Sequence, residues 1–346
     1  MINILILIIG FVMLIKGADL FVDGSSGLAK NFKVPGVIIG LTIVALGTSA
    51  PELAVSTSAA LSGSNEIALS NVVGSNIFNI LSVLGVCAII HPIPVDSGII
   101  KRDFPLSIIS TVIVMLVTGG ITLLTGNYNI LTDTSAANAY NTTENVTVSR
   151  VESPSMSDNV GAVTRITGAL LIATFIVYII ILVAEARKNP EKEEATELSP
   201  MWKCVLFILI GLALIVAGGQ AVVYSAKEIA RAFGMTETLI GLTIVAVGTS
   251  LPELVTSIVA ARKGETGLAV GNAVGSNIFN LLLILGVSAV IHPVAVNLAS
   301  VYDMCILIVI SIITYIFSIT KKTINRLEGA VMVLLYVADV VFAIVR

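Results

Sequence analysis

Two glutamates stand in the middle of long apolar segments, where a charge is costly. Glu52 lies within residues 36–61, and Glu253 lies within residues 237–261. A mild membrane-insertion scale assigns about 2.5–3.5 kcal/mol to a charged residue such as aspartate at a helix centre, so buried acids normally line a cavity and meet a cation. One such acid could be structural, but a pair in matching surroundings indicates one shared cation site.

The residues around each glutamate supply further oxygen atoms. A proline, Pro51 or Pro252, precedes each glutamate and has no N–H to donate, so we expect each helix to break just before its glutamate and to leave carbonyl oxygens facing the cavity. Small and hydroxyl residues share the glutamate's face at helical spacing. They are Ala45, Thr48, Ser49 and Ser56 in the first segment and Ala246, Thr249, Ser250 and Ser257 in the second.

A second polar stripe follows in the apolar segments 66–90 and 267–291. Its residues are four apart and share one helical face. They are Asn71, Ser75 and Asn79 in the first segment and Asn272, Ser276 and Asn280 in the second. We expect Gly74 and Gly275 to let these faces approach their neighbours closely. No Cys, His or Met shares the stripe, and an all-oxygen environment suits a hard cation such as Ca²⁺, which takes about 6–8 oxygen ligands.

Both motifs belong to an internal repeat with an offset of 201 residues. Between residues 40–95 and 241–296, aligned without a gap, 34 of the 56 positions are identical. The repeat includes Val-Gly-Ser-Asn-Ile-Phe-Asn at 73–79 and again at 274–280. Identity at this level indicates a duplicated structural unit.

The composition excludes an ordinary soluble protein. Of 346 residues, 56% are hydrophobic and 12% charged, and the mean hydropathy is +1.02. Apolar stretches long enough for the roughly 20 residues of a spanning helix predict an all-α integral membrane protein with ten transmembrane helices. Those helices are expected near 3–27, 36–61, 66–90, 104–125, 164–186, 203–230, 237–261, 267–291, 302–320 and 327–345.

Five helices per repeat is an odd number, so the second copy enters the membrane from the opposite side. This predicts two inverted five-helix repeats, with helices 2 and 7 discontinuous. The first repeat is 1–186, with its core at 36–90 and an outer polar loop at 126–162; 187–200 is a cytoplasmic linker; the second repeat is 201–346, with its core at 237–291.

The distribution of basic residues gives the orientation. With the N-terminus outside, 13 Lys and Arg side chains fall inside and 5 outside, as the positive-inside rule requires. We therefore expect both termini outside a plasma membrane and the linker in the cytoplasm. Asn141 and Asn145 in the outer loop are weak glycosylation signals.

Several other residues have less specific interpretations. Cys87, Cys204 and Cys305 show no metal-binding or disulfide spacing and are expected to pack in apolar segments. The glycine pairs of Gly36-Val-Ile-Ile-Gly40 and Gly271-Asn-Ala-Val-Gly275 fit simple helix packing. Lys16, Asp19 and Asp23 fit a local ion pair better than a ligand role, and His91 and His292, each before a proline, fit helix ends better than proton carriers.

The charge pattern and motifs exclude other classes of protein. No phosphate-binding Gly-rich loop, HExxH motif or buried base beside Ser49 or Ser250 is present, so we expect neither nucleotide hydrolysis nor another enzymatic activity, and no cofactor. Lys and Arg confined to loops argue against nucleic-acid binding. The expected partners are the lipid bilayer and cations.

The segments at 47–53 and 248–254, Gly-Thr-Ser-x-Pro-Glu-Leu, and at 74–79 and 275–280, Gly-Ser-Asn-Ile-Phe-Asn, resemble the α-repeats of the cation/Ca²⁺ exchanger superfamily. The similarity is greatest to the prokaryotic-type Na⁺/Ca²⁺ exchangers. It implies an antiporter with four ion sites clustered at mid-membrane between helices 2, 3, 7 and 8.

The resemblance also implies ligands. Ca²⁺ would be held by Glu52 and Glu253 with the carbonyl oxygens of Thr48 and Thr249. The Na⁺ sites would use Ala45, Ser49, Ser75, Ala246, Ser250 and Ser276, with the glutamates shared between ions. Asn79 and Asn280 would line the central site, through a water molecule.

One departure from the superfamily bears on the transported ions. Many relatives carry an acid in one of the helix 3 or helix 8 motifs, and the K⁺-dependent branch typically has Asp at the position of Asn280. The resemblance therefore implies K⁺-independent exchange, with about three Na⁺ per Ca²⁺ and net charge movement.

Two other transport functions stay open. A Ca²⁺/H⁺ antiporter would use the buried glutamates as proton carriers, although such relatives usually carry an acid after Gly-Asn, where this chain has Asn71-Val-Val and Asn272-Ala-Val. A passive cation channel also fits the composition, but an inverted repeat favours alternating access.

Overall fold

The computed structural model describes residues 2–62, 65–120, 129–131, 148–150, 159–188, 198–234 and 246–345, and most of these are helical. Within them, seven helices are long and apolar enough to cross a membrane, or eight if the bent pair 36–48 and 50–61 forms one span. The expected all-helical membrane architecture is therefore present. The spans expected at 104–125 and 237–261 run into 121–128 and 235–245, outside the described residues, so the count of ten stays a prediction.

The first half of the chain begins with one long helix and continues with broken ones. Its helices are α1 (Ile2–Phe32), α2 (Gly36–Ile39), η1 (Gly40–Val44), α3 (Ala45–Thr48), α4 (Ala50–Leu61), α5 (Asn65–Phe78), η2 (Asn79–Val83), α6 (Leu84–Ile90), η3 (Ile99–Asp103), α7 (Phe104–Met115), η4 (Leu116–Gly120) and α10 (Arg165–Lys188), where η marks a π-helical turn.

The second half repeats the pattern as far as it is described. Its helices are α11 (Met201–Ala232), α13 (Ala246–Thr249), α14 (Leu251–Arg262), α15 (Thr266–Ile278), η6 (Phe279–Ile284), α16 (Leu285–Ile291), α17 (Leu298–Lys321) and α18 (Arg326–Val345). Helix α17 begins earlier than the expected residue 302, because the Asn297 side chain caps it by accepting a hydrogen bond from Ser300 N at 2.8 Å.

Short antiparallel strand pairs tie the helix ends together. β1 (Ile93–Pro94) pairs with β6 (Thr323–Ile324), and β4 (Asn159–Val163) pairs with β5 (Val294–Asn297). β2 (Asn129–Leu131) pairs with β3 (Val148–Arg150) in the polar loop. Asn141, Asn145 and residues 189–197 of the linker lie outside the described residues.

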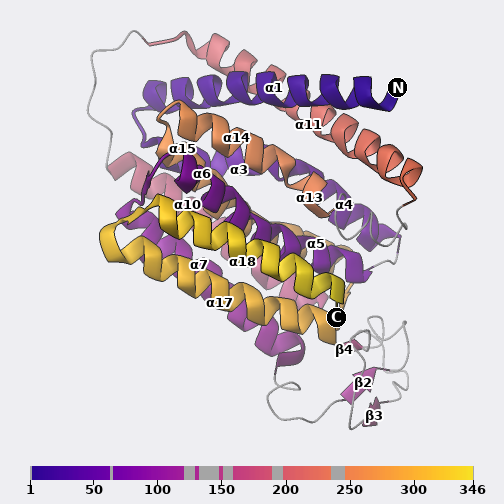
Figure 1. Ribbon diagram of the computed structural model, residues 1–346. Coiled ribbons are helices and arrows are strands. Elements are labelled where there is room, and N and C mark those ends of the chain that lie inside the picture. The colour runs from indigo at the N-terminus through magenta and orange to yellow at the C-terminus, as the bar shows by residue number, and fades with distance from the viewer. Residues whose placement is uncertain are drawn as a thin grey trace.

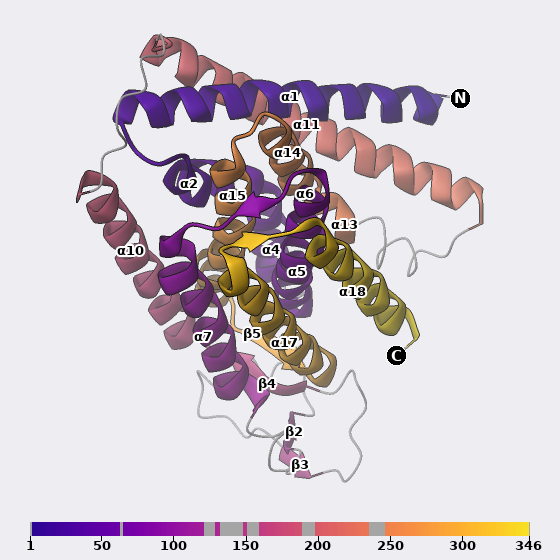
Figure 2. The ribbon, with the colours of Figure 1, turned by 60° about the vertical axis from the view of Figure 1, so that its left-hand side comes forward.

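Helices α1 and α11 form an antiparallel pair along one edge of the molecule (Figures 1 and 2). Glycines make the close packing possible: a Cβ on Gly17 would lie 2.8 Å from the carbonyl oxygen of Gly211, and one on Gly24 would lie 2.7 Å from that of Cys204. Only residues without a side chain at these positions allow such an approach. The pair therefore behaves as one packed unit.

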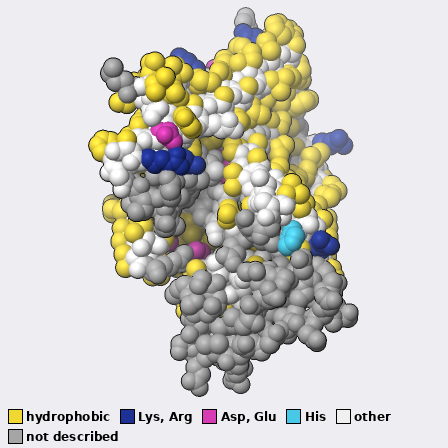
Figure 3. Space-filling model, turned by 90° about the vertical axis from the view of Figure 1, so that its right-hand side faces the viewer, with side chains coloured by type: hydrophobic (Ala, Val, Ile, Leu, Met, Phe, Trp, Pro, Cys, Tyr) yellow, Lys and Arg dark blue, Asp and Glu magenta, His cyan; other side chains and the backbone are white. Residues whose placement is uncertain are grey.

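The repeat motifs occupy the centre of the bundle. The spans 67–90 and 266–291 contain most of α5 and all of α15. In the most apolar 18-residue stretch of each span 78% of the residues are buried, against 28% in α1 and in α11 and 11% in α18. Exposed Leu, Ile, Val and Phe side chains cover the outer helices, and hydrophobic side chains are widespread on the face in Figure 3. A lipid environment suits this surface.

Two sequence expectations are met, one about helix ends and one about glycine packing. The helix containing α6 ends at Ile90, and His91 is extended; the equivalent helix ends at Ile291, and His292 is extended. Gly40 packs against Gly271, since a Cβ on Gly40 would lie 3.0 Å from Gly271 Cα.

Candidate cation-binding site

Glu52 lies just after a break in the helix. α3 ends at Thr48 and α4 begins at Ala50, with a bend of 48° between them. Ser49 stands at the break, with φ −81° and ψ 6°. Pro51 occupies the first turn of α4, where its missing N–H has no intrahelical partner to lose.

The second repeat breaks at the equivalent place. α13 ends at Thr249, α14 begins at Leu251, and Ser250 stands between them with Pro252 in the first turn. Glu253 follows, and like Glu52 its side chain is fully buried. Both acids therefore sit at a helix N-terminus, whose exposed N–H groups favour negative charge.

Each glutamate accepts a hydrogen bond from a serine of the other repeat. Ser49 Oγ donates to Glu253 Oε1 at 3.0 Å, and Ser250 Oγ donates to Glu52 Oε1 at 3.1 Å. Ser75 Oγ lies 3.0 Å from Ser250 Oγ and extends the chain of hydroxyl groups. The two helix breaks thus face each other and form one site.

The second oxygen of each carboxylate has no hydrogen-bond partner among the described residues. Oε2 of Glu52 and Oε2 of Glu253 are both buried without a hydrogen bond, and no ion pair joins either glutamate to a basic side chain of the described residues. The two carboxylates also repel each other. Buried charges without a counter-ion are strongly unfavourable, so this arrangement calls for a cation.

Two asparagines support the site from α5 and α15. Asn71 Nδ2 donates to Ser56 Oγ at 3.0 Å, and Asn272 Nδ2 donates to Ser257 Oγ at 2.9 Å. Asn272 Oδ1 also accepts from Thr48 Oγ1 at 2.9 Å. These amides bind neighbouring helices and so position the backbone beside each glutamate.

The remaining residues expected at the site fall around the same centre. Ala45 is fully buried, and its carbonyl oxygen accepts from Ser49 N at 3.0 Å. Thr249 and Ser276 each lie beside a glutamate. Ala246 begins α13, and its side chain lies outside the described residues.

Asn79 and Asn280 are both fully buried in π-helical turns, η2 and η6, a feature often found at functional sites. Their bonding differs: Asn280 Nδ2 donates to Asn76 Oδ1 at 3.1 Å, whereas neither amide atom of Asn79 bonds to a described residue.

Asn76 and its counterpart Asn277 are not among the residues predicted from the sequence. Each donates its side-chain amide to the other's main-chain carbonyl oxygen at 3.2 Å. Neither residue falls on the expected stripe, whose members are four residues apart. Both belong to the heptapeptide that is identical in the two repeats, and this identity is the signal that could have indicated them.

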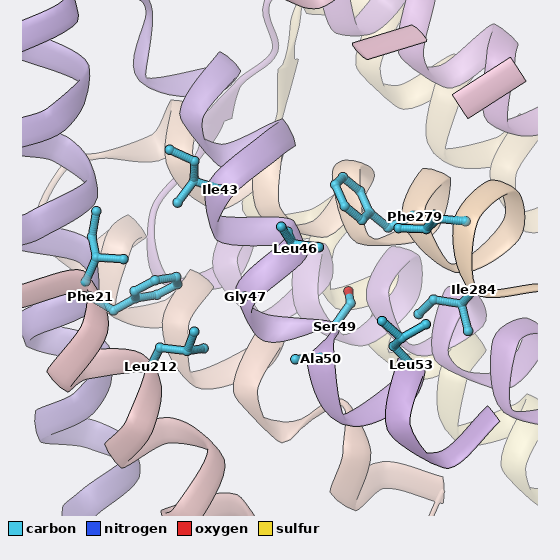
Figure 4. Close-up of a pocket in the computed structure, with 12 residues that line it drawn as sticks. Phe21, Ile43, Leu46, Gly47, Ser49, Ala50, Leu53, Leu212, Phe279 and Ile284 are labelled. Carbon is cyan, nitrogen blue, oxygen red and sulfur yellow. The ribbon is translucent and has the colours of Figure 1, made fainter. Parts of the chain in front are cut away.

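An apolar cleft of about 300 Å³ reaches the site from the side (Figure 4). Phe21 of α1 and Leu212 of α11 form one wall, and Leu46 and Phe279 lie across from them. Ser49 contributes a polar side chain to the lining of this cleft (Figure 4), and its hydroxyl group donates a hydrogen bond to Glu253.

Two further sequence expectations concern close contacts. Gly275 packs closely, since a Cβ there would lie 2.8 Å from Leu41 Cα, whereas Gly74 is exposed and no atom of the described residues lies within 4 Å of such a Cβ. Leu242, the counterpart of Leu41 in the second repeat, lies outside the described residues. The local ion pair expected for Lys16 is present, with Asp19 at 3.9 Å and the Lys16 side chain 73% exposed, and Lys263, directly after α14, lies closer to Asp19, at 3.5 Å.

Comparison with known proteins gives the family. The family model described as "Sodium/calcium exchanger protein" matches residues 2–184 and 203–345. The chain belongs to the sodium/calcium exchanger family. This confirms the resemblance that the paired motifs carry, and the family is one of membrane exchangers.

Relatives match over nearly the whole exchanger chain. The sodium/calcium exchanger MaX1 of Methanosarcina acetivorans is 33% identical over 98% of both chains, and the inner membrane protein YrbG of Escherichia coli is 33% identical over 89% of this chain and 86% of its own. The solved structure of the sodium-calcium exchanger NCX_Mj, soaked with 10 mM Na⁺ and zero Ca²⁺, is 28% identical, covers 98% of both chains and has a TM-score of 0.76.

Proposed function

We propose that this chain is a secondary antiporter that exchanges Na⁺ for Ca²⁺ by alternating access, without a cofactor. The observation that carries the proposal is the pair Glu52 and Glu253, each bound to a serine of the other repeat and each keeping one buried oxygen without a hydrogen-bond partner among the described residues. Carboxylate, hydroxyl and carbonyl oxygens are the ligands that Ca²⁺ prefers. The name of MaX1, a sodium/calcium exchanger, supports the same ions.

The proposed ligands follow the site. Ca²⁺ binds Glu52, Glu253 and the carbonyl oxygens of Thr48 and Thr249. The Na⁺ ions use Ala45, Ser49, Ser75, Ala246, Ser250 and Ser276, with Asn79 and Asn280 at the central position. No group of three or more His, Cys, Asp or Glu side chains lies together among the described residues, so neutral oxygens must complete the coordination.

The charges predict an electrogenic cycle. Two carboxylates with one Ca²⁺ are neutral, whereas two carboxylates with about three Na⁺ carry one positive charge, worth about 2.3 kcal/mol per 100 mV of membrane potential. Asn280 adds no third charge, which favours exchange that does not need K⁺.

We further propose the topology of ten helices as two inverted repeats, 1–186 and 201–346, in the plasma membrane. Both termini are outside, and the linker 187–200 is cytoplasmic. Inverted repeats with a site between them are typical of alternating access.

Antiport follows from the shared ligands. Facing glutamates without a cation are costly in a low-dielectric interior, so only loaded states reorient readily. The packed unit of α1 and α11 is the element we propose to move against the rest, because the apolar cleft separates it from α4 beside Ser49.

The experiment is uptake of radioactive Ca²⁺ into Na⁺-loaded proteoliposomes diluted into buffer free of Na⁺ and K⁺. The wild-type chain should take up Ca²⁺ against its gradient, and Glu52→Gln and Glu253→Gln should each abolish uptake. Ser58→Ala, at an exposed position on α4, is the matched control and should transport normally.

The same assay separates the alternatives. Uptake that ignores Na⁺ and follows an imposed pH gradient would replace this proposal with a Ca²⁺/H⁺ antiporter. Uptake that stops at the equilibrium distribution of Ca²⁺, with no accumulation, would identify a passive channel.

A further inference from the structure

The turn between α14 and α15 contacts α1 through two charged side chains. Lys263 Nζ lies 2.7 Å from Asp23 Oδ1 and 3.5 Å from Asp19 Oδ1, and it donates to the Asp19 carbonyl oxygen at 3.1 Å. Ser26 Oγ donates to Glu265 Oε1. Lys263 thus makes two hydrogen bonds and one longer ion pair to α1.

The turn that carries Lys263 and Glu265 has a well-defined backbone. Gly264 has φ +80°, its N–H bonds to the Ala261 carbonyl at 3.1 Å, and Glu265 N bonds to the Ala260 carbonyl at 2.9 Å. This is the Schellman arrangement that ends many helices. Both charged side chains therefore project from a fixed support.

In the other repeat, the positions equivalent to the charged residues of this contact are all uncharged. Ser62 stands where the second copy has Lys263, and its hydroxyl donates back to the Ser58 carbonyl of its own helix at 2.9 Å. Gln220 and Tyr224 stand where α1 has its two aspartates, and both are exposed. The charged contact thus breaks the pseudo-symmetry of the fold.

The two repeats also differ in how accessible their third and eighth helices are. Ile67 is 53% exposed and Gly74 is exposed, whereas the equivalent Leu268 is 1% exposed and Gly275 is buried. Helix α15 is thus covered along the face that Leu268 and Gly275 share, and it follows directly after the turn that carries the charged contact.

Helix α1, which carries the partners of Lys263 and Glu265, also packs against α11. The glycine packing described above joins the two helices along their length. Asn31 Nδ2 donates to the Ser199 carbonyl at 2.9 Å, which ties the end of α1 to the start of α11. This places the charged contact at the end where the linker 187–200 enters α11.

We propose that Lys263 and Glu265 form a clasp, with Asp19, Asp23 and Ser26 as its partners on α1, that closes the linker end of the transporter and opens once in every transport cycle. The inference rests on the proposed alternating access. The Lys263 side chain is 31% exposed and that of Asp23 53%, and such partly solvated pairs are weak. The clasp therefore biases the equilibrium toward this conformation without locking it.

Cross-linking tests whether the clasp must open. In a background with Cys87, Cys204 and Cys305 replaced by alanine, the pair Asp23→Cys/Lys263→Cys is joined with a short reducible bifunctional thiol reagent in proteoliposomes. Na⁺-driven Ca²⁺ uptake should fall at least tenfold and return on reduction. Asn31→Cys with Cys204 retained joins residues within the α1 and α11 unit, and this control should keep its uptake.

Uptake by the fully cross-linked clasp pair at the rate of the reduced protein would overturn the proposal. A second readout does not need transport and so separates failure of the clasp from failure of the exchange function. Ser25→Cys on α1 is fully buried, and its reaction with an impermeant thiol reagent from the linker side should be several-fold faster in a Lys263→Gln background. Lys30→Gln, which removes a nearby lysine outside the clasp, should leave the rate unchanged; equal rates in all three backgrounds would refute the clasp.

Discussion

Asn76 and Asn277, at equivalent positions of the two repeats, each donate a side-chain amide hydrogen to the other's main-chain carbonyl oxygen at 3.2 Å. Both are buried where α5 and α15 meet. The reciprocal bonds join the repeats close to Asn280, which donates to Asn76 Oδ1 at 3.1 Å. The centre of the bundle therefore depends on bonds between side chains that do not bind the cation in our proposal.

Alanine at either position should destabilise the protein. Asn76→Ala and Asn277→Ala each leave a buried carbonyl oxygen without its donor, which costs about 1–3 kcal/mol. Asn76→Ala should be the worse of the two, because it also removes the acceptor of Asn280. Thermal unfolding in detergent measures this, with Ser70→Ala, an exposed position on α5, as the control. Equal unfolding temperatures for all three variants would contradict the structural role.

Asn79 and Asn280 should respond differently to the same substitution. Because the Asn79 side chain bonds to none of the described residues, Asn79→Ala should leave the unfolding free energy within about 0.5 kcal/mol of the wild type while raising the Ca²⁺ concentration for half-maximal uptake. Asn280→Ala should lower stability by about 1 kcal/mol, because it removes the bond to Asn76. Parallel unfolding and uptake measurements separate the two effects; identical profiles for the two variants would argue against this assignment.

The sequence was sufficient for the features that follow from local chemistry and from the repeat. Hydropathy located the apolar helices, Pro51 and Pro252 predicted the helix breaks, and the buried positions of Glu52 and Glu253 were expected from the cost of charge in apolar segments. These features depend on residues close together in the chain. The sequence indicates that Glu52 and Glu253 share one site, but it does not indicate that Ser49 bonds to Glu253 of the other repeat.

Other features depend on which faces meet, and a periodic pattern does not encode that. Gly74 and Gly275 hold the same place in the two copies of the heptapeptide, yet among the described residues only Gly275 lies close to a neighbouring helix. Asp103 is fully buried and binds Arg102, at 2.7 Å from Nε to Oδ1, as well as Tyr178. The burial of Asp103 and its bond to Tyr178 become visible only after the helices pack.

The support of the site by Asn272 gives a further prediction. Asn272 bonds to both Ser257 and Thr48, whereas Asn71 bonds to Ser56 and has no equivalent bond from Thr249. Groups that orient ligands typically change metal affinity about 10–100-fold when removed. Asn272→Ala should therefore reduce Ca²⁺ affinity in that range, and Asn71→Ala should reduce it less. Calorimetric titration of purified protein with Ca²⁺ measures both affinities. A larger loss of Ca²⁺ affinity in Asn71→Ala than in Asn272→Ala would contradict this prediction.

The pairing of α1 with α11 can be tested through one methyl group. In Gly17→Ala the new Cβ would lie 2.8 Å from the Gly211 carbonyl oxygen and 2.9 Å from Ile215 N, both backbone atoms that cannot rotate away. The two helices must move apart, so we expect a loss of about 1–3 kcal/mol in unfolding free energy, as for other overpacked interiors. Gly74→Ala is the matched control, because no atom lies within 4 Å of its new Cβ. Thermal unfolding of both variants in the same detergent gives the comparison. If Gly17→Ala unfolds at the temperature of Gly74→Ala, the two helices are separated readily, and they cannot move as the single unit that the clasp requires.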